Sequence, residues 1–305
     1  MCTASLPCEV RCLACAARSG ARHASHRGLL FHYVRAFVPH ASSPAATAVW
    51  RVRKSLESVL HFHPSATIMF HYLSGDALKR DRTLRAGIQR LQAAGYNVQI
   101  HSGLHLARLL GNLTTADAIR EWEHGRNWPF HASEFARYAL LWRHGGVYLD
   151  TDVIFARPLA PSSLPSFVAY ENPQKTRIDG AVLGFARGHE LPLALLREAI
   201  TEYTDESSRP TDSAVGPRLL TRVVRSRGRP WGINVLSWKA FNPVPRARIG
   251  KWCFEQLARR GNRTLPLPKS TYALHLSARL TLQYHNVQEG TLCHRLYSSH
   301  CVLCD

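Results

Sequence analysis

Short apolar runs alternate with longer amphipathic stretches through the early part of the chain, and this alternation limits the fold more than any other feature. The runs have the length and the β-branched and aromatic content of strands, and they cover residues 29–38, 66–72 and 96–100. The stretches between them, 43–62 and 77–94, place apolar residues on one helical face. Strands that alternate with helices form a mostly parallel sheet covered by helices on both faces, so the sequence predicts an α/β fold.

The composition is that of a globular protein. The chain has 305 residues, of which 45% are hydrophobic and 20% are charged. It has no long uninterrupted apolar run, so we expect no transmembrane segment in the chain as given. The net charge of +18 favours an anionic partner, such as a phosphorylated small molecule or an anionic membrane surface. The cations are scattered and no nucleic-acid-binding motif is present, so we expect no nucleic acid partner.

The first 28 residues are rich in Arg, Ala and Cys and contain a single acidic residue, Glu9. This composition resembles that of a transit peptide, and it lacks the apolar region of a secretory signal. We therefore expect a poorly structured N-terminal extension over residues 1–28 and a single domain over residues 29–305.

Most of the eight cysteines lie in the two tails. Residues 12–15 and 301–304 both have the CxxC spacing of a four-thiolate zinc site. No compact knuckle pattern surrounds either pair, so C-terminal disulfides in an oxidising compartment are favoured over zinc. The glycosylation sequons at Asn112 and Asn262 agree with such a compartment.

The strongest functional signal is a DXD motif at the end of an apolar strand. Apolar residues at helical spacing follow Ser133, a residue type that favours helix starts, and a Gly–Gly pair ends this helix. A short strand over 147–149 leads to Asp150 and Asp152, whose side chains project from one side of an extended chain. Close carboxylates repel each other unless a cation lies between them, and an oxygen pair suits Mg²⁺ or Mn²⁺. An exposed DXD turn without function is common, but a position at the carboxyl end of a strand favours the metal site.

Glu134 and Arg137 lie three residues apart on one face of the preceding helix. They are compatible with a surface ion pair, which would add little stability. They are equally compatible with donor binding, because Arg can contact a phosphate and an acid can accept hydroxyl groups of a ribose or sugar. The spacing alone leaves both interpretations open.

Residues 131–158 resemble the DXD sugar-binding region of glycosyltransferase family 32, whose pattern is roughly S-D-x-x-R, a helix, and G-G-x-Y-L-D-x-D. In this chain the pattern begins with Ser133-Glu134-x-x-Arg137 and ends with G-G-V-Y-L-D-T-D. Five later segments resemble motifs of the alpha-1,4-glycosyltransferase group: I-D-G-A-V-L-G-F at 178–185, G-P-R-L-L-T-R-V at 216–223, F-N-P-V at 241–244, Y-A-L-H-L at 272–276, and L-x-x-x-x-C at 296–301. The chain is thus similar to this group over nearly all of its expected domain.

The resemblance implies a GT-A fold and a metal-dependent, retaining transfer of a hexose, galactose or N-acetylglucosamine, from a nucleotide-sugar donor such as a UDP-hexose. The implied acceptor is a glycolipid, as in glycosphingolipid biosynthesis, or another glycan. The resemblance divides the domain into a nucleotide-sugar-binding half over 29–158, which ends in the DXD motif, and an acceptor-side half with a C-terminal closing segment over 159–305. It also implies the Golgi membrane or lumen, with membrane association through an N-terminal anchor missing from the chain as given or through the basic surface.

The resemblance assigns roles residue by residue. Asp150 and Asp152 match the metal ligands for Mn²⁺ or Mg²⁺, and His275 matches a histidine that completes the metal site. Asp179 stands where the family has Asn; beside the donor sugar, this carboxylate would stabilise an oxocarbenium-like centre or act as the catalytic nucleophile. The nucleotide-sugar-binding residues implied by the motif are Glu134, Arg137, Tyr148, Asp150, Asp152 and Gly180.

The chain departs from the family shortly after His275, where the family reads W-N and this chain has Ser277-Ala278. The departure keeps a second function open, that of a catalytically impaired relative that binds nucleotide-sugar or glycan. Donor hydrolysis measured with and without Mn²⁺ distinguishes the two functions.

Overall fold

The computed structural model describes residues 28–36, 45–125, 127–160, 164–204, 215–226, 231–255, 266–281, 283–284 and 286–303. The extension expected over residues 1–28 lies outside this part of the chain except for its last residue. The first two residues of the helix expected over 43–62, the sequon at Asn262 and the CxxC pair at 12–15 also lie outside it.

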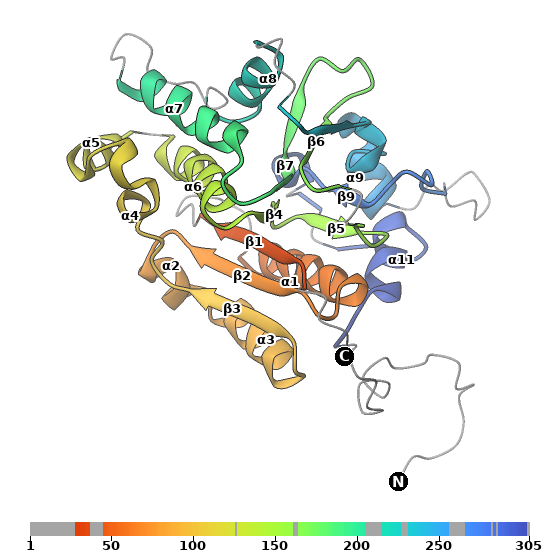
Figure 1. Ribbon diagram of the computed structural model, residues 1–305. Helices are drawn as coiled ribbons and strands as arrows, with labels where there is room; N and C mark the ends of the chain where they lie inside the picture. Colours follow the sequence, from red (N-terminus) through yellow and green to blue (C-terminus); the bar gives the residue numbers. More distant parts are fainter. Residues whose placement is uncertain are drawn as a thin grey trace, which may run out of the picture.

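A seven-stranded sheet in the order β3-β2-β1-β4-β7-β6-β8 runs through the centre of the domain (Figure 1). Its strands are β1 (Leu30–Arg35), β2 (Thr67–Tyr72), β3 (Asn97–His101), β4 (Gly146–Leu149), β6 (Phe167–Tyr170), β7 (Ile178–Phe185) and β8 (Asn234–Leu236). Only β7 runs antiparallel to its neighbours, β4 and β6, and the other pairs are parallel. The α/β class and the mostly parallel sheet expected of a GT-A fold are confirmed.

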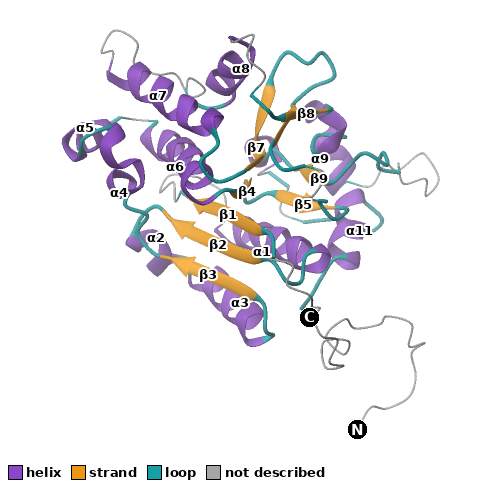
Figure 2. Ribbon diagram, viewed as in Figure 1, coloured by secondary structure: helices purple, strands orange, loops and turns teal. Residues whose placement is uncertain are grey.

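Helices cover both faces of this sheet (Figure 2). Tyr33 and Val34 are successive residues of β1 and therefore point to opposite faces. Tyr33 packs in a buried apolar cluster with α1 and α3, whereas Val34 packs in a second cluster with α6, α7 and α8. The helices are α1 (Ala45–Phe62), α2 (Gly75–Arg80), α3 (Arg82–Ala93), α4 (Leu106–Leu110), α5 (Ala116–Trp122), α6 (Trp128–His144), α7 (Glu190–Thr204), α8 (Pro217–Ser226), α9 (Arg246–Phe254), α10 (Ala278–Thr281) and α11 (Leu292–Ser299).

A small second sheet joins the two halves of the chain. β5 (Val153–Phe155) follows the DXD motif directly and pairs antiparallel with β9 (Ala273–His275). A third apolar cluster, formed largely by α9 and α11, packs around Ile154 of β5 and Leu274 of β9. The C-terminal segment is thereby held beside the motif.

The helix expected over 77–94 is broken at Asp81 into α2 and α3. The Asp81 carboxylate accepts a hydrogen bond from Arg35 Nε at 3.2 Å, at the end of β1. Its backbone leaves helical geometry, with φ −88° and ψ 50°. A polar partner outside the helix has therefore overridden the helical pattern of the sequence.

The helix before the DXD motif is longer than the sequence predicts. It begins at Trp128, and Pro129 occupies its first turn, where the missing N–H of proline costs nothing. Ser133 is therefore not the N-terminal cap. Its hydroxyl donates a hydrogen bond to the Phe130 carbonyl at 2.6 Å, one turn back in the same helix.

Three cysteines near the C-terminus have different environments. Cys301 is disulfide-bonded, in agreement with the disulfides expected in this region. Cys253 on α9 and Cys293 on α11 are free thiols, and both are fully buried in the third apolar cluster. Within the described residues, none of the helices combines the length and the apolarity needed to cross a bilayer.

Four histidines lie beside one another across neighbouring elements: His32 on β1, His71 on β2, His101 on β3 and His144 at the end of α6. His32 Nδ1 lies 3.4 Å from His71 Nε2, and the rings of His71 and His101 stack at 4.9 Å between centroids. Burial, together with repulsion from the neighbouring imidazoles, lowers the pKa of His32 to about 4 and that of His71 to about 3. Both side chains are therefore neutral in the folded protein at neutral pH.

We expect this cluster to make the fold sensitive to acid. Histidine titrates near ~6.5 in an unfolded chain, whereas the pKa values of His32 and His71 are about 4 and about 3 in the folded state. Between these values the unfolded chain binds more protons, so the free energy of unfolding falls as the pH drops below ~6.5. His71→Leu should reduce this dependence by up to about 1.4 kcal/mol per pH unit, measured by urea denaturation across the pH range. His124→Gln, at an exposed position, is the control, and an equal slope in both variants would contradict the prediction.

Candidate functional site

A tight junction between α6 and β4 positions the DXD turn. Gly145 and Gly146 end the helix with φ values of +68° and +95°, which residues with side chains rarely adopt. A Cβ atom on Gly146 would lie 2.5 Å from the carbonyl oxygen of Leu30, so glycine is required where β4 enters the sheet beside β1. The motif therefore emerges at the edge formed by the carboxyl ends of the parallel strands, where α/β sheets bind ligands.

The structure brings together the three residues that the sequence predicts as metal ligands. Asp150, Asp152 and His275 each offer a ligand atom, and these atoms lie within 4.8 Å of one another. The pairing of β5 with β9 places Val153 opposite His275, so the imidazole comes from the far end of the chain to the DXD turn. Its Nε2 atom lies 3.7 Å from Asp152 Oδ1. Metal binding by this group stays a prediction.

The chemistry of this group fits a divalent cation. Two carboxylates and one imidazole suit Mn²⁺ well and Mg²⁺ less well, because Mg²⁺ prefers oxygen ligands alone. The side chain of Asp150 is 30% exposed, so the group is open on one side to further oxygen ligands such as those of a diphosphate. Two negative charges so close together are also stabilised by a cation between them.

Asp179 lies behind His275, on the side away from the DXD aspartates. Its Oδ2 atom lies 3.4 Å from His275 Nδ1 and accepts a hydrogen bond from Asn242 Nδ2 at 2.6 Å. Burial alone would lower the pKa of His275, but the carboxylates of Asp152 and Asp179 raise it to about 10. Burial alone would raise the pKa of Asp179, but His275 and Asn242 hold it below its usual range. In the absence of metal, His275 and Asp179 therefore form an ion pair.

Two groups at this site are not identified by the sequence analysis. Asn242 lies in the F-N-P-V segment, whose resemblance to the family pattern marks the segment but gives no role to its amide. The backbone N–H of Ala278 donates a hydrogen bond to Asp152 Oδ2 at 2.6 Å. A backbone donor leaves no signal in residue type, so no sequence pattern could have located it.

Arg137 is buried, with 5% of its surface exposed, and it binds several groups around the motif. Its guanidinium pairs with Glu134 at 3.1 Å and with Asp150 at 3.2 Å, and it donates to the Gly180 carbonyl at 2.5 Å. Burial lowers the pKa of Arg137, but the surrounding anionic groups, Glu134 first among them, raise it well above the usual value. The interpretation of Glu134 and Arg137 as a surface ion pair is therefore wrong, because Arg137 is buried and the side chain of Glu134 is only 15% exposed.

Tyr148 and Gly180 complete the surroundings of Arg137. The Tyr148 ring lies beneath the guanidinium, 4.4 Å from Cζ to the ring centroid, and its hydroxyl donates to Asp150 Oδ1 at 2.8 Å. A Cβ atom on Gly180 would lie 2.5 Å from Arg137 Nη1, so a larger residue would displace the guanidinium. Both residues thus fix Arg137 and Asp150 in place. Their direct contact with a donor stays a prediction.

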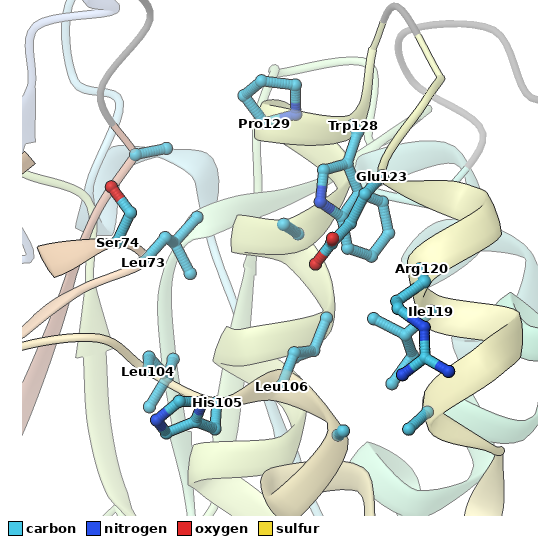
Figure 3. A pocket seen from close by; sticks show the side chains of 14 residues that line it. Leu73, Ser74, Leu104, His105, Leu106, Ile119, Arg120, Glu123, Trp128 and Pro129 are labelled. Carbon is cyan, nitrogen blue, oxygen red and sulfur yellow. The ribbon is translucent and has the colours of Figure 1, made fainter. Parts of the chain in front are cut away.

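A hollow of about 390 Å³ opens at the carboxyl ends of β1 and β2 (Figure 3). Leu73, Leu104 and Ile119 give it an apolar wall, and Trp128 lies at the start of α6. Its polar side chains are those of Ser74, His105, Arg120 and Glu123. Because β1 pairs with β4, this hollow and the DXD turn lie along the same edge of the sheet.

Comparison with known proteins agrees with this site. Residues 50–171 match the family model of the glycosyltransferase sugar-binding region containing DXD motif. Residues 184–305 match the alpha 1,4-glycosyltransferase conserved region. Together the two regions include the DXD motif, Glu134, Arg137, Asn242 and His275, whereas Asp179 and Gly180 lie in the short gap between them.

Individual relatives are similar over part of their length. Lactosylceramide 4-alpha-galactosyltransferase from Rattus norvegicus is 29% identical over 242 residues, which are 73% of this chain and 61% of the rat protein. Alpha-1,4-N-acetylglucosaminyltransferase from Homo sapiens is 28% identical over 193 residues, which are 58% of this chain and 51% of the human protein. This chain therefore spans less than two thirds of the length of these relatives. Among solved structures, the PaToxG glycosyltransferase has a TM-score of 0.47 and 16% identity, covering 65% of this chain and 69% of that one.

The buried network around Arg137 predicts a large effect on stability. Arg137→Gln would leave Glu134 and Asp150 without their cation, so we expect the free energy of unfolding of the metal-free protein to fall by about 3 kcal/mol. The control is Lys79→Gln, which removes an exposed pair with Asp76 and should cost under ~1 kcal/mol. Urea denaturation of both variants measures the two costs, and similar losses would contradict the buried role of Arg137.

Proposed function

Because this chain belongs to the DXD-containing alpha-1,4-glycosyltransferase family, we propose that it transfers a hexose from a nucleotide-sugar donor to a glycolipid or glycan acceptor. The transfer would retain the anomeric configuration, as the family resemblance implies. Galactose and N-acetylglucosamine are the sugars named for the relatives in the two comparisons above. We place the reaction in the Golgi by the same resemblance.

The observation that supports this function most strongly is the convergence of Asp150, Asp152 and His275 at the carboxyl edge of the sheet. These side chains would hold Mn²⁺ or Mg²⁺. When bound, such an ion supplies Lewis acidity that offsets the negative charge developing on the departing diphosphate. Asp150 is oriented for this by Tyr148 and Arg137, and Asp152 by the Ala278 amide.

The hollow beside β1 and β2 would receive the nucleoside of the donor. It lies on the same sheet edge as the DXD turn, and its wall is apolar with a few polar groups, as small-molecule sites usually are. Arg120 and Glu123 carry donors and acceptors for a base or ribose. Glu134 and Arg137 lie further along α6, where the donor sugar or diphosphate would follow the nucleoside.

We propose that Asp179 orients His275 rather than attacking the donor. Both carboxylate oxygens are already engaged, one by the Ala181 amide at 3.0 Å and the other by Asn242 and His275. A carboxylate bound to the far nitrogen of a metal-binding histidine fixes the ring and its tautomer. The nucleophilic role that the sequence analysis left open is the alternative.

The first test is a donor screen for metal-dependent hydrolysis, because it needs no acceptor. The purified protein should hydrolyse one UDP-hexose in the presence of Mn²⁺ and lose this activity with a chelator. Asp150→Asn and Asp152→Asn should each lower the rate by ~100-fold or more, since each removes charge that stabilises the transition state. Donor binding without hydrolysis in the wild-type protein would instead support the catalytically impaired relative that the Ser277-Ala278 departure keeps open.

Asp179→Asn separates the two roles of Asp179 and restores the residue type that the family has at this position. If Asp179 orients His275, the amide oxygen can still face the ring nitrogen but the charge is lost, so we expect a loss of about 10- to 100-fold in Mn²⁺ affinity or activity. If Asp179 is the nucleophile, activity should fall by more than ~10⁴-fold while Mn²⁺ affinity is unchanged. Mn²⁺ titration and donor hydrolysis on the same variant give both numbers.

A further inference from the structure

Arg51 on α1 is buried, with 2% of its surface exposed, and its guanidinium holds a segment from the opposite end of the chain. Nη1 donates to Thr281 Oγ1 at 3.0 Å, and Nη2 donates to the carbonyl oxygens of Thr281 and Tyr284, each at 2.7 Å. The guanidinium also lies over the ring of Phe254, 4.7 Å from its centroid. No carboxylate forms an ion pair with Arg51 in the part of the chain that the structure describes.

A buried charge without a paired counter-ion is costly, so its presence needs a reason. The hydrogen bonds of Arg51 go to two backbone carbonyl oxygens and one hydroxyl oxygen of Thr281 and Tyr284, so the guanidinium finds polar partners although it is buried. Apolar residues could fill the same space but could not bind three oxygen atoms of another segment. The contacts of Arg51 therefore hold in place the segment that contains Ser277, Thr281 and Tyr284, which we call the Thr281 segment.

The Thr281 segment includes a strained turn beside the metal ligands. Ser277 has a φ of +50°, a conformation that residues with side chains rarely adopt. Thr281 Oγ1, which accepts from Arg51, donates to the Leu276 carbonyl at 3.1 Å on the other side of the turn. A strained turn persists only when its surroundings hold it, and Thr281 links this turn to Arg51.

The Ser277 turn fixes the orientation of the Asp152 carboxylate. The N–H of Ala278 donates to Asp152 Oδ2 at 2.6 Å, and the N–H of Leu276 donates to the backbone oxygen of Asp152 at 3.1 Å. With Oδ2 occupied by a backbone donor, Oδ1 is the carboxylate oxygen on the side of His275, 3.7 Å from its Nε2 atom. The orientation of Asp152 therefore depends on the position of the turn.

We propose that Arg51 is a positioning residue of the metal site, acting through Thr281 and the Ser277 turn on the carboxylate of Asp152. This role rests on the proposed function, because it assumes that Asp152 binds a divalent metal. Within the described residues, Arg51 forms no hydrogen bond or ion pair with Asp150, Asp152 or His275. Its effect passes through contacts that end in the Ala278 amide.

The test measures Mn²⁺ affinity by calorimetric titration in the presence of UDP, well below the unfolding temperature of each variant. Arg51→Gln should weaken Mn²⁺ binding about 10-fold or more, as substitutions of residues that orient metal ligands do. Arg51→Lys keeps the charge but lacks the planar fork of donors that the guanidinium presents to Thr281 and Tyr284, so it should recover only part of the affinity. Thr281→Val keeps Arg51 and removes the hydroxyl link, so it should shift the affinity in the same direction and replaces the Arg51 variants if they fail to fold.

Ile249→Ala is the matched control. Ile249 is buried in the same apolar cluster as Phe254 but makes none of the contacts described here, so this variant should lower the melting temperature and leave Mn²⁺ affinity unchanged. Hydrogen exchange gives a second readout, because the amides of residues 276–281 should exchange faster in Arg51→Gln than in Ile249→Ala.

The outcomes separate this role from the proposed function. If the wild-type protein binds Mn²⁺ and the Arg51 and Thr281 variants bind it equally well, the positioning role is overturned while the metal site stands. Faster exchange at 276–281 with unchanged Mn²⁺ affinity also overturns it, because Arg51 would then hold the segment without affecting Asp152. A wild-type protein that binds no Mn²⁺ contradicts the proposed function and, with it, this role.

Discussion

Repulsion between the two DXD aspartates, with the carboxylate of Asp179 held behind His275, is the constraint on which the rest of the structure depends. These carboxylates lie in a partly buried site, where like charges interact more strongly than in water. The positive charges around them come from separate parts of the fold. Arg137 on α6 pairs with the first aspartate of the motif, His275 on β9 lies between the second aspartate and Asp179, and Arg51 on α1 fixes the turn that binds the second aspartate. The site therefore forms only when helices and strands from the whole chain are in place.

The short pairing of β5 with β9 brings the C-terminal part of the chain to the DXD motif. Each strand has three residues, and the register sets Val153 opposite His275. Because side chains alternate between the two faces of a strand, a shift of one residue would turn His275 away from the motif. The apolar cluster around Ile154 and Leu274 prevents such a shift, since the same change would expose these two buried side chains. Packing in the third cluster thus protects the geometry of a polar site.

The sequence predicts the parts of this structure that local patterns encode. The alternation of strands and helices predicts the sheet. The Gly–Gly pair followed by an apolar strand predicts that Asp150 and Asp152 lie at the carboxyl end of a strand. His275 was found only through the family resemblance, because no local pattern distinguishes it from the other sixteen histidines. The break at Asp81 depends on Arg35, a partner distant in sequence, and no helical pattern reveals it. The same limit hides backbone donors, such as the amide that binds Asp152.

The Ser277-Ala278 departure has a different meaning once the contacts are known. The group that holds Asp152 is the backbone N–H of Ala278, and a backbone donor is present whichever side chain the residue carries. What the site needs from this segment is the turn at Ser277, which Thr281 and Arg51 stabilise from outside it. Loss of the family's Trp and Asn therefore leaves the contacts of the Asp152 carboxylate intact. Its effect should therefore fall on molecules that would meet those two side chains directly, rather than on the orientation of Asp152.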